Sequence, residues 1–360
     1  MRGDLALGID TPSELEALRI ELGAEWPAIR ASRERAIQLF ATLRAELVGC
    51  APADTSIIVF GSLARLETTS GSDVDWTLLV DGAADPQHLD AALEIERRLR
   101  ELGVRPPGRE GTFGGLAFSH DLLHNIGGED DTNRNTTRRI LLLLESTAIG
   151  DPAAHDRVVR NLLRRYIQED VDGTGGDSPF KVPRFLQNDI ARYWHTMAVD
   201  FAYKRRLRAR EGWALRTAKL RMSRKLIYAA GLLACFSCAV EFEPRLEEPR
   251  QIGVFRVVDH LAALVRTPPL DIIARFARRF PELGAAAADL FGAYDGFLAL
   301  LDDPERRGRL KAIPPEEAAA DPVYGEVKKL GASFQHALDR FFFESDGTPL
   351  PSLTRKYGVF

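Results

Sequence analysis

A chain of 360 residues is long enough to form two domains. With 45% hydrophobic and 28% charged residues it has an ordinary globular composition, and its formal net charge of -4 excludes a strongly basic or strongly acidic protein. The N-terminus lacks the basic and then apolar plan of a signal peptide, and the longest apolar stretch, Leu226 to Val240, is shorter than the roughly 20 residues that a membrane-spanning helix needs. We therefore expect a cytoplasmic protein without a membrane partner.

The first 150 residues mix helices and strands. Short runs rich in β-branched residues predict strands, and apolar residues at steps of three and four predict helices. The predicted strands are residues 56–60, 74–80 and 111–119, and the predicted helices are residues 11–48, 86–102 and 133–148. This part of the chain should therefore form a small mixed sheet with helices.

After Pro152 the pattern becomes almost purely helical, with long helices predicted at residues 183–210 and 213–234. Cys235 and Cys238 form a CxxC in an apolar helical run without a second CxxC, so we expect buried, reduced thiols rather than a zinc site. The sequence thus predicts an α+β protein, with a catalytic domain at residues 1–150 and an α-helical domain at residues 151–360.

The most informative stretch runs from Phe60 to Trp76 and reads FGSLARLETTSGSDVDW. Asp73 and Asp75 alternate along a predicted strand, so their side chains leave the same face. Two neighbouring carboxylates are costly unless a cation holds them together, and Mg²⁺ prefers such ligands. Gly61 permits close approach of the backbone, and Ser62 offers a hydroxyl and an amide at the start of a short helix, where phosphate binds readily. These residues predict a clamp for a metal-bridged triphosphate.

Gly-Ser followed after about ten residues by Asp-x-Asp resembles the signature of the polymerase-β-like nucleotidyltransferase superfamily. The finer form, with Arg65 and Glu67 after Gly-Ser and Ser72 before the acids, looks like the branch that contains the nucleotidyltransferase domain of the bacterial PII-uridylyltransferase and related signalling proteins. This resemblance implies that Asp73 and Asp75 are catalytic and bind Mg²⁺ (or Mn²⁺). It also implies a nucleotide-binding set of Gly61, Ser62, Arg65, Ser72, Lys219 and Lys225.

Members of this superfamily usually carry a third carboxylate on a later strand, where it helps to activate the attacking hydroxyl. Asp121 directly follows the predicted third strand and is the preferred candidate for a third catalytic residue. The acidic cluster from Glu129 to Asp131 is the alternative, although acids just before a helix that begins near Asn133 are more typical of a helix cap.

A basic segment lies in the predicted helical domain. Between Lys181 and Lys225 there are 13 lysine or arginine residues against three acids, Asp189, Asp200 and Glu211. They form either a positive wall over the site, which would grip triphosphate or a nucleic acid, or an ordinary solvated face. Lys219 and Lys225 are the preferred triphosphate contacts, because helical-domain lysines play this part in similar enzymes. Arg138 and Arg139, early in the helix from Asn133, either face the nucleotide or pack.

The leading hypothesis is an enzyme that transfers a nucleoside monophosphate from an NTP substrate to a protein, RNA or nucleotide acceptor and releases pyrophosphate. Two alternatives stay open. One is a non-catalytic, nucleotide-binding regulator, which the uncertain third carboxylate favours. The other is a toxin or defence enzyme that acts on tRNA or makes a nucleotide second messenger. The acceptor and the preferred base also stay open.

Overall fold

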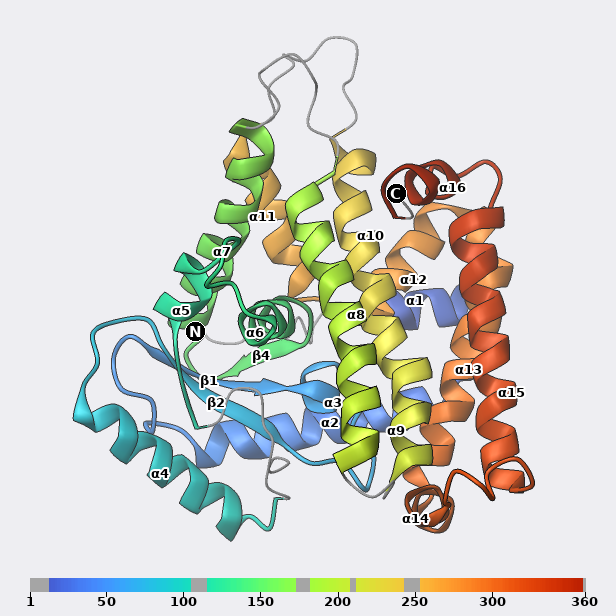
Figure 1. Ribbon diagram of the computed structural model, residues 1–360, viewed down its shortest axis with the longest axis horizontal. Coiled ribbons are helices and arrows are strands. Elements are labelled where there is room, and N and C mark those ends of the chain that lie inside the picture. Colours follow the sequence, from blue (N-terminus) through green and yellow to red (C-terminus); the bar gives the residue numbers. More distant parts are fainter. Residues whose placement is uncertain (1–12, 105–114, 173–181, 208–211, 243–252, 359–360) are drawn as a thin grey trace.

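The computed structural model describes residues 13–104, 115–172, 182–207, 212–242 and 253–358. Within these residues four strands form one sheet in the order β3-β2-β1-β4 (Figure 1). The strands are β1 (Thr55–Phe60), β2 (Asp75–Val80), β3 (Leu116–Phe118) and β4 (Ser146–Ile149). β1 runs antiparallel to β2 and to β4, whereas β2 and β3 are parallel. A small mixed sheet followed by a largely helical remainder confirms the predicted α+β fold.

Helices surround the sheet and account for most of the remaining described residues. Those of the first 150 residues are α1 (Glu14–Glu21), α2 (Pro27–Glu46), α3 (Gly61–Ala64), α4 (Pro86–Glu101), α5 (Ser119–His124) and α6 (Asn133–Leu144). The later ones are α7 (Ala153–Asp172), α8 (Arg184–Leu207), α9 (Trp213–Lys219), α10 (Lys225–Glu241), α11 (Val254–Val265), α12 (Pro269–Arg279), α13 (Gly284–Asp302), α14 (Pro304–Ala312), α15 (Pro322–Asp339) and α16 (Leu350–Leu353).

A π-helical turn, Leu220–Arg224, joins α9 to α10 and makes one continuous helical segment from Trp213 to Glu241. Further π-helical segments, Arg340–Glu344 and Thr354–Gly358, follow α15 and α16, and a short 3₁₀ turn, Pro281–Leu283, precedes α13.

Two predicted helices differ from the observed ones. The single helix predicted over residues 11–48 is broken between α1 and α2, because Gly23 and Trp26 have left-handed φ angles of 61° and 38° and Pro27 begins α2. The helix predicted over residues 133–148 ends at Leu144, and β4 follows it. By contrast, the predicted helix at residues 86–102 agrees with α4, which Asp85 caps by accepting a hydrogen bond from the Gln87 amide.

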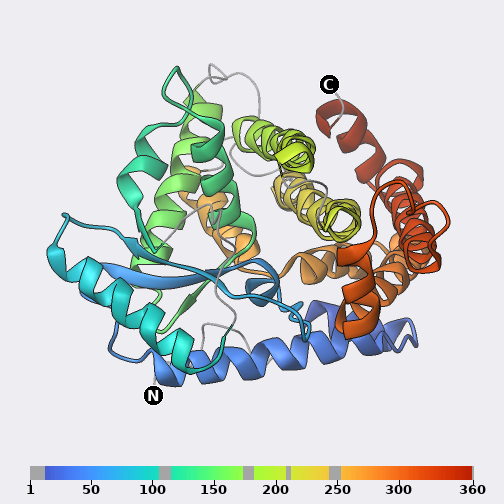
Figure 2. The ribbon, with the colours of Figure 1, turned by 60° about the horizontal axis from the view of Figure 1, so that its bottom comes forward.

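The two faces of the sheet pack into different cores, because side chains alternate along each strand. Ile57, Val59 and Leu78 belong to a smaller core with side chains of α2 and α4. Ile58 and Leu79 belong to a larger core formed mostly by the later helices. Figure 2 shows α2 running from beneath the sheet to the C-terminal helices, in keeping with the packing of α2 against α13.

The larger core takes in residues of both predicted domains. Trp26 packs against Phe291 of α13, with 4.8 Å between ring centroids and an interplanar angle of 43°, and α1 packs on α12. Residues 1–150 and 151–360 thus share buried contacts, and the boundary at residue 150 stays a prediction.

Two helical segments, Trp213–Glu241 and Pro281–Asp302, are long and apolar enough to cross a membrane by length and composition. In the structure 72% and 56% of their most apolar windows are buried, as in core helices, which pass the same test. Cys235 and Cys238 lie in the first of them as free, buried thiols, as predicted, and burial raises the pKa of Cys238 to about 12.

Candidate active site

Three strands of the sheet meet at the end of β1, and the motif lies there. Phe60, the last residue of β1, is paired with Asp75 on one side and with Ser146 on the other. Asp75 is the first residue of β2, and Glu145 immediately precedes Ser146. Asp75 shares a face with Phe60 and Leu79, which belong to the larger core, so it points toward the later helices.

Gly61 and Asp75 lie directly beside each other. A Cβ atom added at Gly61 would be 3.6 Å from Oδ2 of Asp75, and Gly61 has a left-handed φ of 68°, which favours glycine. Ser62 follows in the short helix α3, and its carbonyl accepts a hydrogen bond from the Glu67 amide at 2.7 Å. The backbone of the Gly-Ser turn therefore borders the carboxylate.

Asp73 precedes β2 and is exposed, whereas Asp75 is half-buried. Burial, together with the neighbouring charges of Asp73 and Glu145, raises the pKa of Asp75 to about 6, while the charges of Arg224 and Lys219 act in the opposite direction. The structure thus brings Gly61, Ser62, Asp73 and Asp75 to one end of the sheet. It also shows that Asp75 lies near the negative charges of Asp73 and Glu145, and a bound cation would offset the repulsion between them.

Two cations of the helical segment face these acids. Lys219 ends α9, and burial lowers the pKa of its amine to about 8, while the charge of Asp73 acts in the opposite direction. Arg224 ends the π-helical turn, and its charge lowers the pKa of Asp75. Two cations of the basic segment, Lys219 and Arg224, thus lie near the acids, and their part in a positive wall that grips triphosphate stays a prediction.

Glu145 connects Arg224 to the α/β part of the structure. Its Oε1 accepts a hydrogen bond from Nη1 of Arg224 at 2.7 Å, and its Oε2 is ion-paired with Nη1 of Arg65. Arg65 also donates from Nε to Glu67 at 2.9 Å, and the Tyr294 hydroxyl donates to the same Glu67 oxygen at 2.8 Å. Burial alone would raise the pKa of Glu145, but Arg224 and Arg65 outweigh it and the pKa is lowered.

The loop between the two halves of the motif is held by α14. Arg307 donates from Nη1 to the hydroxyl of Thr69 at 3.1 Å and from Nη2 to the carbonyl of Gly71. At the end of α13, Asp302 accepts a hydrogen bond from the Ser70 amide at 2.7 Å. Helices distant in sequence thus fix the loop that leads from Ser62 to Asp73.

Asp121 does not lie with the other acids, and the prediction that it is the third carboxylate has to be corrected. β3 is parallel to β2, and Phe118 at its end pairs with Val80. Asp121 therefore follows the end of the sheet opposite to Asp75, which starts β2 about 17 Å away along the strand. Its side chain is 61% exposed and its near neighbours include His120.

Three predicted nucleotide contacts also have other roles. Lys225 donates from Nζ to Oε1 of Gln335 on α15 at 2.5 Å, away from Asp75. Arg65 is buried between Glu67 and Glu145, which occupy its guanidinium. The Ser72 hydroxyl lies 3.0 Å from the Thr69 amide and accepts its hydrogen bond, so it closes the loop. These contacts argue against a direct part in phosphate binding for the three side chains.

The start of α6 is structural. Thr132 caps it by accepting a hydrogen bond from the Asn135 amide. Asp131 pairs with the fully buried Arg139, whose guanidinium also reaches Asp189, so this member of the acidic cluster holds an arginine, which argues against it as the third carboxylate. Arg139 therefore packs, the second of the two roles left open for it.

The sequence did not predict Glu145 or Arg307 as residues near the site, and it included Arg224 only as one member of the basic segment. Glu145 is a lone acid at the end of the apolar block from Ile140 to Leu144, a signal that could have drawn attention to it. Arg224 was hidden among the basic residues beside Lys225. Nothing in the sequence links Arg307 to a loop some 236 residues earlier.

Within the described residues no group of three or more His, Cys, Asp or Glu side chains could hold a metal ion. The best donor set at this end of the sheet is the pair Asp73 and Asp75, which matches the one or two carboxylates that Mg²⁺ takes in addition to substrate phosphates.

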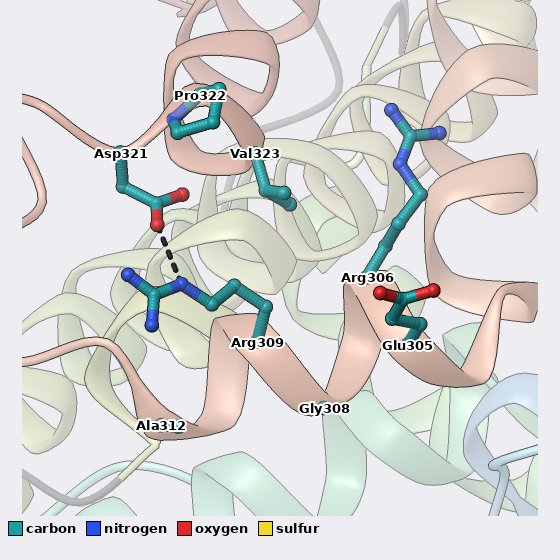
Figure 3. A pocket seen from close by; sticks show the side chains of 8 residues that line it. All are labelled: Glu305, Arg306, Gly308, Arg309, Ala312, Asp321, Pro322 and Val323. Carbon is teal, nitrogen blue, oxygen red and sulfur yellow. Dashed lines mark hydrogen bonds and ion pairs between the residues drawn. The ribbon is translucent and has the colours of Figure 1, made fainter.

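A separate hollow of about 580 Å³ lies between α14 and the start of α15 (Figure 3). Arg309 donates to Asp321 at 2.7 Å across it, and Arg306 is paired with Glu326. Arg306 and Arg309 lie on the face of α14 opposite to Arg307, which contacts the motif loop. The hollow therefore does not open onto the motif.

Comparisons with known proteins bear on the motif-bearing part of the chain. A family model described as "Putative nucleotidyltransferase DUF294" matches residues 28–109. A comparison with curated proteins finds no match to the chain. The matched segment begins in α2, extends beyond α4 and contains Gly61, Ser62, Asp73 and Asp75. Residues 28–109 of this chain are thus similar to a nucleotidyltransferase domain family.

Proposed function

We propose that the protein is a nucleotidyltransferase that uses Mg²⁺ or Mn²⁺ to transfer a nucleoside monophosphate from an NTP to an acceptor. The observation that carries this proposal is the meeting of Asp73 and Asp75 with Gly61 and Lys219 at one end of the sheet. The similarity of residues 28–109, which include these motif residues, to a nucleotidyltransferase domain family also supports it.

The donor set fits a divalent metal, because Asp75 lies among the negative charges of Asp73 and Glu145 and the glycine at residue 61 leaves room beside its carboxylate. When bound, the metal supplies charge neutralisation at the phosphates of the NTP. Asp73 and Asp75 hold it, the backbone at Gly61 and Ser62 approaches the phosphates, and the Lys219 amine binds them from the helical side. Positioning and electrostatics of this kind account for most of the catalysis of phosphoryl transfer.

In the reaction an acceptor oxygen or nitrogen bonds to the α-phosphorus and loses its proton to solvent, and the bond from that phosphorus to the bridging oxygen breaks, so that pyrophosphate leaves with the electron pair. The resemblance to the PII-uridylyltransferase branch favours a protein acceptor or a signalling nucleotide. The basic residues around Lys219 and Arg224 are also compatible with an RNA acceptor.

A non-catalytic, nucleotide-binding regulator is the second candidate, and a specific observation favours it. Asp121 lies at the far end of the sheet, and both oxygens of Glu145 are occupied by arginines. Among the described residues neither of these two acids is placed to take a proton from the acceptor.

The test is to incubate the full-length protein and Mg²⁺ with each α-³²P-labelled NTP and a cell lysate, and then to separate protein, RNA and small molecules. We expect label in one fraction, and its loss in Asp75→Asn, which removes a charge but preserves the shape. Asp121→Asn is the matched control and should retain the label, because it removes an exposed acid from the opposite end of the sheet.

Nucleotide binding is measured separately by isothermal titration calorimetry with Mg²⁺. Binding without label in any fraction would support the regulator. Label that persists in Asp75→Asn would show that the site lies elsewhere.

A further inference from the structure

The ion pair between Glu145 and Arg224 joins the end of α6 to the π-helical turn. Glu145 lies at the junction of α6 and β4, beside the end of β1, whereas Arg224 ends the π-helical turn. The Glu145 side chain is 3% exposed, and that of Arg224 is 31% exposed. One partner is therefore part of the interior, while the other still reaches the surface next to the acids.

Glu145 is itself fixed from the opposite side. Arg65 pairs with it and with Glu67, and Glu67 also accepts the Tyr294 hydroxyl. Charged side chains buried in this way are held in one geometry, because each loses hydrogen bonds if it rotates away. Arg65 and Glu145 therefore form a rigid base on which the Arg224 guanidinium rests.

We propose that Arg224 binds the phosphates of the NTP and that Glu145 is the positioning residue that aims it at the site. An arginine suits this task, because its planar guanidinium can donate to a carboxylate from one nitrogen and to a phosphate from another. Glu145 precedes Ser146, and both Ser146 and Asp75 pair with Phe60, so the Arg224 guanidinium that rests on Glu145 lies at the same end of the sheet as Asp75. This inference rests on the proposed function and names a second phosphate contact beside Lys219.

The direction in which Glu145→Gln changes phosphate affinity distinguishes a positioning role of Glu145 from a purely electrostatic one. Replacing Glu145 by glutamine removes a negative charge close to the site, and by Coulomb's law alone this should tighten the binding of a polyanion. If Glu145 holds Arg224 in place, its removal should instead weaken binding. The two readings predict opposite changes in the dissociation constant.

The experiment measures binding of the preferred NTP, and of inorganic tripolyphosphate, to the full-length protein with Mg²⁺ by calorimetry. We expect Arg224→Gln to weaken both ligands about 10- to 100-fold, the range for loss of a charged hydrogen bond. Arg221→Gln is the matched control: it lies in the same π-helical turn but is exposed beside Gly331 of α15, and it should leave binding unchanged.

Glu145→Gln should weaken binding in the wild-type background but not in the Arg224→Gln background, because a positioning residue acts through its partner. Thermal unfolding of each variant is recorded as well, since loss of a buried ion pair can destabilise the fold. If Glu145→Gln does not fold, the comparison of Arg224→Gln with Arg221→Gln still decides whether Arg224 binds phosphate.

Tighter binding in Glu145→Gln, or equal weakening in both backgrounds, would overturn the positioning role. Unchanged binding in Arg224→Gln would overturn the phosphate contact. If these variants bind normally while Asp75→Asn loses Mg²⁺-dependent binding, only this inference fails. If the wild-type protein binds none of the four NTPs, the proposed function fails with it.

Discussion

Lys219 and Lys225 lie six residues apart on one helical segment, but their surroundings differ. Lys219 faces Asp73 and Asp75, whereas Lys225 donates to Gln335 of α15. The π-helical turn between them contains one residue more per turn than an α-helix and so changes which side chains point to the site. The position of each amine, rather than the total positive charge, should decide its effect on the reaction.

We predict that Lys219→Gln lowers kcat/KM for the NTP about 10- to 100-fold, because a charge-assisted hydrogen bond to phosphate is lost. Lys225→Gln removes the same charge and should change kcat/KM by less than about twofold. Steady-state kinetics of the two variants, at equal salt, checks this. Equal losses in both would mean that the basic face acts only through its overall field.

At this scale the sequence predicted which motif residues lie together, while their part in binding or catalysis stays a prediction. Gly61, Ser62, Asp73 and Asp75 lie within one short stretch, so a single turn and strand bring them together. Asp121 could not be placed, because nothing local encodes whether the third strand runs parallel or antiparallel to β2.

At the scale of elements, the loop from Glu67 to Ser72 depends on a close approach that only glycine allows. A Cβ atom at Gly71 would lie 2.5 Å from Nε of Arg307, and Arg307 also donates to the Gly71 carbonyl. We predict that Gly71→Ala displaces this guanidinium, destabilises the fold by about 1–3 kcal/mol and shifts the loop before Asp73. Urea unfolding and kcat measure the two effects.

Gly308, the neighbour of Arg307 in α14, provides the control. A Cβ atom there would meet nothing within 4 Å, so Gly308→Ala should stabilise the helix by roughly 0.5–1 kcal/mol and leave kcat unchanged. Wild-type stability and activity in Gly71→Ala would show that Arg307 can move away without consequence.

Element boundaries were predicted less well where tertiary contacts decide them. α6 ends at Leu144 because Glu145 leaves the helix to pair with Arg65 and Arg224, and Ser146 then pairs with Phe60. The apolar pattern from Ile140 to Leu144 cannot predict these partners, because they are distant in sequence. The break between α1 and α2 was also missed, although Gly23 and Pro27 are local signals for it.

For the whole molecule, the α/β part and the helical part are stabilised together. Carboxylates of the later helices cap amides of the N-terminal ones: the buried Asp271 accepts from the Leu15 amide at 3.1 Å, and the half-buried Asp295 accepts from the Ile29 amide at 2.9 Å. Arg33 pairs with the same Asp271 at 2.7 Å. The sheet face that carries Ile58 and Leu79 is covered by residues of the larger core.

We therefore predict that a fragment of residues 1–150 lacks a cooperative unfolding transition, because it would expose this apolar face and leave the amides of Leu15 and Ile29 without their acceptors. Circular dichroism and tryptophan fluorescence during urea unfolding measure this, with the full-length chain as the control that should unfold cooperatively. A sharp transition in the fragment, with coincident probes, would instead establish residues 1–150 as an independent domain. In that case the contacts of Asp271, Asp295 and Arg307 would align the two parts for catalysis without being needed for the α/β part to fold.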